Sequence, residues 1–294
     1  MPDAIELVVT CDENYLMPLR ALIASAAINN PGERLRVHLL HSSVASSSLR
    51  LMERYSALFG VEFNDVRIDR QKFDEAYASK RYPQEMYYRM LAPLILDGVR
   101  DRMLYLDPDI LVINPLRPLW DIDLVGTAFA AASHLDPEHP VTELNRLRLD
   151  TDHEYFNTGV ILMDAPAARE LIDPPELFAQ TTEHDWSLLF PDQDIFNALY
   201  GRYTLCVPDS VWNYDARKYS DYLLRTAGQT SMSWVMEHTS ILHFCGREKP
   251  WLPGAYHGRF DALYKNYAQI ARRAWDVLAG APDTTANEEA PCEN

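Results

Sequence analysis

The chain has 294 residues, of which 47% are hydrophobic and 24% are charged, and this balance excludes an intrinsically disordered protein. Its formal net charge of -16 at pH 7 repels phosphate backbones and anionic lipid surfaces, so we expect no nucleic-acid partner. An acidic protein that binds an anionic ligand needs local positive charge, from a metal ion or from a placed lysine or arginine.

The cysteines and the apolar runs indicate the compartment. The four cysteines lie far apart and form no C-x-x-C pair, which favours neither a zinc knuckle nor a disulfide framework. No apolar run reaches the roughly 18 to 20 residues that a membrane-spanning helix needs, and no secretory leader begins the chain. We therefore expect a cytoplasmic protein.

Strands and helices alternate in the first part of the chain. Apolar runs predict strands over residues 5–11, 35–41 and 61–68, and helical patterns follow through about residue 29 and over 47–58. A polar segment, 71–84, comes next. Such alternation predicts an α/β fold with a Rossmann-like, mostly parallel sheet, right-handed crossovers and helices on both faces.

The pattern continues in the rest of the chain. It predicts helices over 86–96 and 192–200 and strands over 102–106, 126–133, 156–163 and 240–244, with a mixed aromatic region over 203–239. The sheet should therefore have about six or more strands. We expect a single domain of residues 1–280, with a nucleotide-binding part of about 1–110 and an acceptor and catalytic part of about 111–280. Residues 281–294 should form a disordered acidic tail.

Two acids, Asp107 and Asp109, flank Pro108 at the carboxyl end of the strand expected over 102–106. In open α/β sheets this edge binds ligands, and two carboxylates there can hold Mn²⁺ or Mg²⁺. The alternative is a turn in which the acids cap backbone N–H groups. Apolar residues on both sides favour the cation, because charges in such surroundings need a partner.

A histidine and a lysine near the C-terminus could complete this site. His243 ends an apolar strand and opens a glycine-containing loop, which makes it a candidate third ligand, although a lone histidine is more often an ordinary core or surface residue. Lys249 could neutralise a phosphate as a compact charge. The alternative interpretation is that Lys249 is an ordinary lysine whose ammonium lies in solvent.

Five separated motifs stand out along the chain. They are Asp12-Glu13-Asn14-Tyr15, Tyr105-Leu106-Asp107-Pro108-Asp109, Phe156-Asn157-Thr158-Gly159-Val160, Asp192-Gln193-Asp194, and the segment from His243 to Trp251. Taken together, they resemble glycosyltransferase family 8 in order and spacing over about residues 5–251. The family includes bacterial lipopolysaccharide galactosyl- and glucosyltransferases and the glycogenins. The resemblance implies a GT-A type of α/β fold and a UDP-sugar donor.

The resemblance also implies a role for each matching residue. The expected Mn²⁺ ligands are Asp107, Asp109 and His243; the expected uridine contacts are Asp12, Asn14 and Tyr15. Gly246 and Lys249 should face the diphosphate, Arg89 should lie near the donor sugar, and Asn157, Asp192 and Gln193 should touch the transferred sugar. Structural alternatives are a helix cap for Asp12 and for Asp192, a core aromatic for Tyr15, a surface ion pair for Arg89 and a strand-end turn for Asn157.

The implied activity is the transfer of galactose or glucose from a UDP-sugar to a saccharide such as lipopolysaccharide or another glycan, with retention of configuration by front-face attack. Two alternatives are a metal-dependent nucleotidyltransferase or hydrolase of sugar nucleotides, and a relic that binds a UDP-sugar without catalysis. The acidic turn Asp12-Glu13, in place of a glycine-rich phosphate loop, favours a preformed UDP-sugar. A relic would be expected to lose a ligand or Lys249.

Two features depart from the family pattern. Many relatives place an aspartate toward the donor sugar where this chain has Ser133-His134, with Asp136 two residues on. Some relatives also dock on membranes through a basic C-terminal extension, whereas this chain ends in acidic residues, so peripheral membrane contact is unsupported. The stretch 264–275 is expected to be a final helix packed on the domain, or alternatively an amphipathic helix against lipid.

Overall fold

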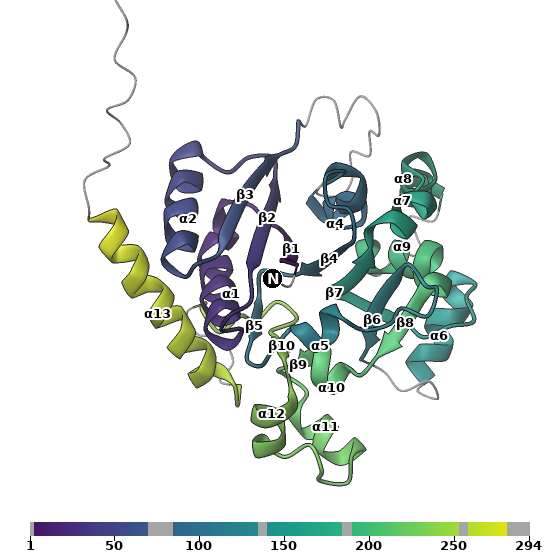
Figure 1. Cartoon of the computed structure of the whole chain (residues 1–294). Coiled ribbons are helices and arrows are strands. Elements are labelled where there is room, and N and C mark those ends of the chain that lie inside the picture. The colour runs from purple at the N-terminus through teal and green to yellow at the C-terminus, as the bar shows by residue number, and fades with distance from the viewer. Residues whose placement is uncertain (1–2, 70–84, 135–139, 184–189, 253–257, 281–294) are drawn as a thin grey trace, which may run out of the picture.

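The computed structural model describes residues 3–69, 85–134, 140–183, 190–252 and 258–280. Over these residues a seven-stranded sheet forms the centre, and helices lie on both of its faces (Figure 1). A smaller sheet of three strands lies below it in the same view. The predicted α/β class is confirmed. The expected segment 71–84, Asp136 and the tail 281–294 lie outside the described residues.

The strands of the large sheet lie in the order β3-β2-β1-β4-β7-β6-β8. Their bounds are β1 Ile5–Thr10, β2 Leu35–His41, β3 Glu62–Arg67, β4 Arg102–Leu106, β6 Phe129–Ser133, β7 Phe156–Asp164 and β8 Thr204–Val207. The small sheet has the order β5-β10-β9, with β5 Ile110–Val112, β9 Tyr214–Asp215 and β10 Ile241–His243.

The helices connect these strands. In the first half of the chain they are η1 Glu13–Tyr15, α1 Leu16–Asn29, α2 Ser46–Leu58, α4 Glu85–Ile95, α5 Arg117–Trp120 and α6 Pro140–Leu149. In the second half they are α7 Ala165–Leu171, α8 Pro174–Glu183, α9 Pro191–Tyr200, η2 Gly201–Tyr203, α10 Asp209–Trp212, α11 Tyr219–Arg225, α12 Met232–His238 and α13 Asp261–Ala279. Most predicted elements therefore lie within one or two residues of their expected bounds.

The two faces of strand β4 bury alternate side chains in two separate cores. Leu104 and Leu106 join the core under α1, α2 and α13, whereas Met103 and Tyr105 join the core under α4, α7, α8 and α9. Each fully buried side chain of this size contributes roughly 1.5–3 kcal/mol. Burial on both faces explains why this strand is an almost continuous apolar run in the sequence.

Strand β7 runs against its neighbours. It pairs antiparallel with both β4 and β6, while the other pairings in the large sheet are parallel. Leu106 pairs with Val160, and the backbone N–H of Asp107 donates to the carbonyl of Gly159 over 2.8 Å. The start of β7, which carries Asn157, therefore lies at the edge where β4 ends.

The small sheet brings the end of β4 beside β10. After Asp109 the chain enters β5, which pairs antiparallel with β10, so Ile110 lies opposite His243. The backbone N–H of Phe244 donates to the carbonyl of Asp109 over 3.0 Å. On its other side His243 pairs with Asp215 of β9. This register places the acids of the strand end next to the histidine.

Two regions differ from the predicted elements. The strand expected over 126–133 begins three residues later, at Phe129, because Val125 and Gly126 have φ angles of 53° and 80° and form a left-handed turn. The region 203–239, expected to be mixed, contains β8, β9 and three short helices.

Helix α13 packs against α1 and α2 through buried residues that include Tyr264, Tyr267 and Ala271. The expectation of a final helix packed on the protein is confirmed. Arg272 and Arg273 are exposed on its outer side. Within the described part of the chain, no helix combines the length and the apolar character that crossing a membrane requires.

Candidate active site

Asp107, Asp109 and His243 come together at the carboxyl end of β4. Nε2 of His243 lies 3.3 Å from Oδ1 of Asp109 and 3.6 Å from Oδ2 of Asp107, and one ligand atom from each of the three residues lies within 4.8 Å of the others. Ligands bonded at about 2.0–2.1 Å around an octahedral cation are roughly 3 Å apart. Two carboxylates and one imidazole therefore fit a divalent cation such as Mn²⁺ or Mg²⁺ with little adjustment.

A chain of hydrogen bonds orients the imidazole of His243. The backbone N–H of Gly159 donates to Oδ1 of Asn157 over 3.0 Å, and Nδ2 of Asn213 donates to the same oxygen over 2.8 Å. Oδ1 of Asn213 therefore faces Nδ1 of His243, at 2.9 Å, and Nδ1 must carry the proton. When a cation takes the place of the proton on Nε2, the lone pair of Nε2 points toward it and the two acids, as in histidines that ligate metals.

Gly159 leaves room for this arrangement. A Cβ atom built on Gly159 would lie 2.8 Å from Nδ1 of His243 and 2.9 Å from Oδ2 of Asp107, and it would overlap Cε1 of the same histidine. Such separations are too short for real side chains. The absence of a side chain on β7 is therefore a condition for the acids and the imidazole to meet.

Lys249 is buried and forms an ion pair with Oδ2 of Asp109, so it is not a solvated lysine. Its ammonium also donates to the carbonyl of Phe244 over 2.8 Å. Burial alone would raise the pKa of Asp109, but the charges of His243 and Lys249 outweigh it and hold that pKa below its ordinary value. Asp109 is therefore ionised at neutral pH, as a cation ligand must be.

Arg89 of α4 connects the acids of two motifs. Its Nη2 lies 3.3 Å from Oδ1 of Asp107 and 3.3 Å from Oδ2 of Asp192. Its Nη1 donates to the carbonyl and the hydroxyl of Thr158, both at 3.1 Å, and its guanidinium stacks over the ring of Tyr105. The side chain is 12% exposed, so the alternative of a surface ion pair is wrong.

Asn157 and Gln193 face each other across the site. Nδ2 of Asn157 donates to Oε1 of Gln193 over 3.0 Å. Gln193 and Asp192 lie in the first turn of α9, whose N-cap is Phe190, so the alternative of Asp192 as the cap is wrong. The first turn of this helix therefore presents an acid and an amide toward the start of β7.

Asp194, the third residue of the same motif, serves a structural role. It is fully buried and accepts bonds of 2.8 and 2.6 Å from the guanidinium of Arg148 and one of 2.5 Å from the hydroxyl of Tyr155. These contacts anchor the beginning of α9. They fix the direction in which Asp192 and Gln193 project.

Asp12, Asn14 and Tyr15 lie at the end of β1. Asp12 caps the short helix η1, as its structural alternative proposed, because its carboxylate accepts from the backbone and the amide of Asn14, both at 3.0 Å. The ring of Tyr15 is 37% exposed and meets Trp251 edge-on, with centroids 6.2 Å apart. A core position for Tyr15 is therefore wrong. The charge of Lys249 acts on the pKa of Tyr15, which partial burial raises.

Gly246 follows the buried end of β10 and has a φ of 84°, a conformation that favours glycine. A Cβ atom there would overlap the guanidinium of Arg217. The loop from His243 to Lys249 thus turns sharply, and this turn returns Lys249 to Asp109.

The sequence assigned no role to some polar residues that lie at this site. Asn213, fully buried between His243 and Asn157, comes from an aromatic region without periodicity, and no signal in the sequence distinguishes it. Tyr105 belongs to the second motif but received no role there, and its hydroxyl donates to Oδ1 of Asp107 over 2.7 Å. His134, which the sequence marked as a departure from the family pattern, lies next to Asn213, and its Nε2 donates to the carbonyl of that residue.

Comparisons with known proteins identify the family of this chain. The sequence profile named Glycosyl transferase family 8 matches residues 6–254. General stress protein A of Bacillus subtilis (strain 168) is 29% identical over 94% of this chain and 96% of that protein. Lipopolysaccharide 1,2-glucosyltransferase of Escherichia coli (strain K12) is 24% identical over 82% of this chain and 70% of that protein.

Solved structures show the same fold. The galactosyltransferase LgtC, crystallised with donor and acceptor sugar analogs, matches with a TM-score of 0.73 at 22% identity, over 90% of this chain and 96% of that one. The glycosyltransferase GlyE of Streptococcus pneumoniae TIGR4 matches with a TM-score of 0.66 at 20% identity, over 95% of this chain and 64% of that one. The fold is the GT-A type, and the chain belongs to glycosyltransferase family 8 and is a glycosyltransferase.

Proposed function

We propose that the protein transfers galactose or glucose from a UDP-sugar to a saccharide, with retention of configuration, and that it uses a divalent cation, Mn²⁺ or Mg²⁺. The observation that carries this proposal is the meeting of Asp107, Asp109 and His243 beside Lys249. In a protein of net charge -16, a cation held there supplies the local positive charge that an anionic diphosphate requires.

The diphosphate end of the donor would lie against the cation and Lys249. A bound cation would act as a Lewis acid toward the charge that builds on the departing UDP. Lys249 would contribute a second positive charge, and the turn at Gly246 would let the backbone approach a phosphate oxygen. The ion pair between Lys249 and Asp109 supports this role, because it keeps the ammonium beside the ligands.

The uridine end would lie against Asp12, Asn14 and Tyr15. The exposed ring of Tyr15 offers a stacking surface, and the carboxylate of Asp12 offers an acceptor for ribose or base donors. The ring of Tyr15 meets that of Trp251, and the ammonium of Lys249 lies 5.8 Å from the centre of the Trp251 ring, which supports a short distance between this end and the diphosphate end.

The sugar would lie between Arg89 and the pair Asn157 and Gln193. As the bond from the anomeric carbon to the UDP oxygen breaks, its electron pair leaves with UDP, and the acceptor hydroxyl attacks the same face. The hydroxyl proton then passes to the departing phosphate. Asp192 is engaged by Arg89, which supports front-face attack rather than a covalent intermediate on this carboxylate.

Features outside the cation site support a glycan acceptor and a cytoplasmic reaction. Relatives are named for transfer of glucose or galactose to lipopolysaccharide, which supports a glycan acceptor. We place most donor-binding residues in about residues 1–110 and the acceptor and reacting groups in about 111–280, within one domain of residues 1–280. The scattered cysteines support a cytoplasmic reaction.

Membership of the family favours sugar transfer over nucleotidyl transfer. The presence of Asp107, Asp109, His243 and Lys249 in one place favours catalysis over a binding relic.

A donor screen tests the proposal. UDP-glucose and UDP-galactose are incubated with Mn²⁺ and the protein, and nucleotide products are separated. Release of UDP with slow background hydrolysis supports a transferase. UMP with sugar 1-phosphate would indicate a hydrolase, and pyrophosphate from a parallel incubation with UTP and sugar 1-phosphate would indicate a nucleotidyltransferase. Tight UDP binding without any product would indicate a relic.

A further inference from the structure

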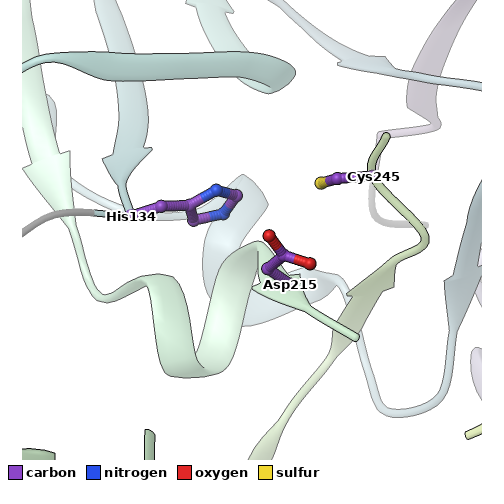
Figure 2. Close-up of side chains that lie close together, drawn as sticks. All are labelled: His134, Asp215 and Cys245. Carbon is purple, nitrogen blue, oxygen red and sulfur yellow. The ribbon is translucent and has the colours of Figure 1, made fainter. Parts of the chain in front are cut away.

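A second group of ligand-type side chains lies beside the first. One ligand atom from each of His134, Asp215 and Cys245 lies within 4.8 Å of the others. His134 follows the end of β6, Asp215 belongs to β9, and Cys245 lies two residues after the end of β10. Figure 2 shows the three side chains converging from these separate segments. None of the three is a member of the first group.

The hydrogen bond of His134 leaves one ring nitrogen free to bind a cation. Its Nε2 lies 2.6 Å from the backbone carbonyl of Asn213, and because a carbonyl only accepts, Nε2 carries the proton. The lone pair then lies on Nδ1. A histidine whose other ring nitrogen donates to a backbone carbonyl is the usual arrangement at metal sites. Burial also lowers the pKa of His134 to about 4, so the ring is neutral at pH 7.

The carboxylate of Asp215 is oriented from one side. It is fully buried, and Oδ1 accepts from the backbone N–H and the Nε of Arg217 over 3.1 and 2.9 Å. From the described residues Oδ2 accepts one bond, of 2.7 Å, from Nη2 of Arg217. A carboxylate oxygen can accept two bonds, so Oδ2 retains capacity for a cation.

Cys245 determines which cation the group would prefer. Its thiol is buried, and a thiolate is a soft ligand, whereas the first group offers only carboxylates and an imidazole. We propose that His134, Asp215 and Cys245 form a second cation site, selective for Zn²⁺ and similar thiophilic ions, directly beside the site at Asp107, Asp109 and His243. Cysteine, histidine and aspartate are all ordinary ligands of Zn²⁺.

Binding of Zn²⁺ at this group would release one proton and would stabilise the fold. The thiol proton is released to solvent as the metal–sulfur bond forms, and the two anionic ligands offset the ion's charge beside Arg217. Three protein ligands leave one tetrahedral position for water. The ion would connect the end of β6 in the large sheet to β9 and to the loop after β10. It should therefore stabilise the folded protein.

Cobalt(II) provides the test, because a cobalt–thiolate bond gives a near-ultraviolet charge-transfer band that carboxylate and imidazole ligands do not give. The starting protein carries Cys206→Ser and Cys292→Ser, which removes an exposed thiol and one in the C-terminal segment. After treatment with EDTA and desalting, it is titrated with Co²⁺ and then with Zn²⁺. Cys245→Ala, His134→Ala and Asp109→Asn are made in the same background.

We expect the band at one equivalent of Co²⁺, its loss on addition of Zn²⁺, its loss in Cys245→Ala and its weakening in His134→Ala. Asp109→Asn should keep the band, and Zn²⁺ should raise the Tm of this variant but not that of the double variant Asp109→Asn/Cys245→Ala. No band in the starting protein, a band that survives Cys245→Ala, or a band lost in Asp109→Asn would overturn the proposal. If an alanine variant does not fold, Cys245→Ser and His134→Asn replace it. The measurement needs no sugar nucleotide, so its result is independent of the proposed transfer.

Discussion

Nδ1 of His243 donates to Oδ1 of Asn213 over 2.9 Å in the protein interior, and this bond turns the other ring nitrogen toward Asp107 and Asp109. The direction of the bond follows from the hydrogen bonds of Asn157, which fix the amide of Asn213. Asn213 thus positions the imidazole without facing the cation itself.

Replacement of Asn213 by alanine should weaken Mn²⁺ binding by about 10- to 100-fold, the usual effect of losing a residue that orients a metal ligand. The Mn²⁺ concentration that gives half-maximal activity measures this change. Asn266→Ala, on the exposed face of α13, serves as the control. Equal Mn²⁺ dependence of both variants would show that Asn213 does not orient the ligand.

Substitution of Gly159 by alanine should abolish most of the activity. The added Cβ would force His243 and Asp107 apart, and displacements of about 1 Å at reacting groups cost on the order of 100-fold in rate. Gly98→Ala is a matched control, since no atom lies within 4 Å of the Cβ that it adds. Rates are compared at saturating Mn²⁺. If Gly159→Ala kept the rate of the control, the space at β7 would be unimportant.

The position of Asp107 and Asp109 at the end of a strand could be predicted from the sequence for a physical reason. β4 is buried on both faces and therefore forms an uninterrupted apolar run, so the polar residues that end it are conspicuous. The family resemblance then supplied His243, whose pairing with β5 depends on contacts between distant segments.

The remaining features depend on such distant contacts. The reversed direction of β7, which brings Asn157 to the end of β4, follows from chain connections and leaves no local pattern. Asn213 and Asp215 belong to a short, irregular region where neither helical nor strand periodicity develops. Their roles became visible only when the partners were placed.

Gln193→Ala should lower kcat by on the order of 100-fold while the KM for the donor changes little, if this amide acts in the transition state. Gln193 bonds to Asn157 and lies beside Asp192, at the proposed reacting face. Steady-state kinetics with the preferred UDP-sugar separate the two constants. A rise in KM at constant kcat would assign the residue to binding alone.

Glu33 and Arg117 form an ion pair near the protein surface, which should stabilise the folded state. The hydrogen bonds from Arg117 lower the pKa of Glu33. Because the folded pKa is depressed, the stabilisation is complete above the unfolded pKa of about 4.3 and is lost as the pH falls through the folded pKa. Glu33→Gln should therefore lower the free energy of unfolding by about 1 kcal/mol at pH 7.

Urea unfolding at pH 7 and pH 3 measures the effect of Glu33→Gln. The difference from wild type should shrink at the lower pH, and Glu53→Gln, on the exposed side of α2, should show little difference at either pH. A difference that stays constant with pH would exclude the ion pair as its source.

The central claim is that Asp107, Asp109 and His243 hold a cation that binds the donor's diphosphate. Calorimetric titration of UDP into the protein tests it most directly, with Mn²⁺ and with EDTA, for the wild type and for Asp109→Asn. The account predicts tight UDP binding only for the wild type with Mn²⁺, and weak binding in the other three titrations. Equal UDP affinity with Mn²⁺ and with EDTA in the wild type would contradict it.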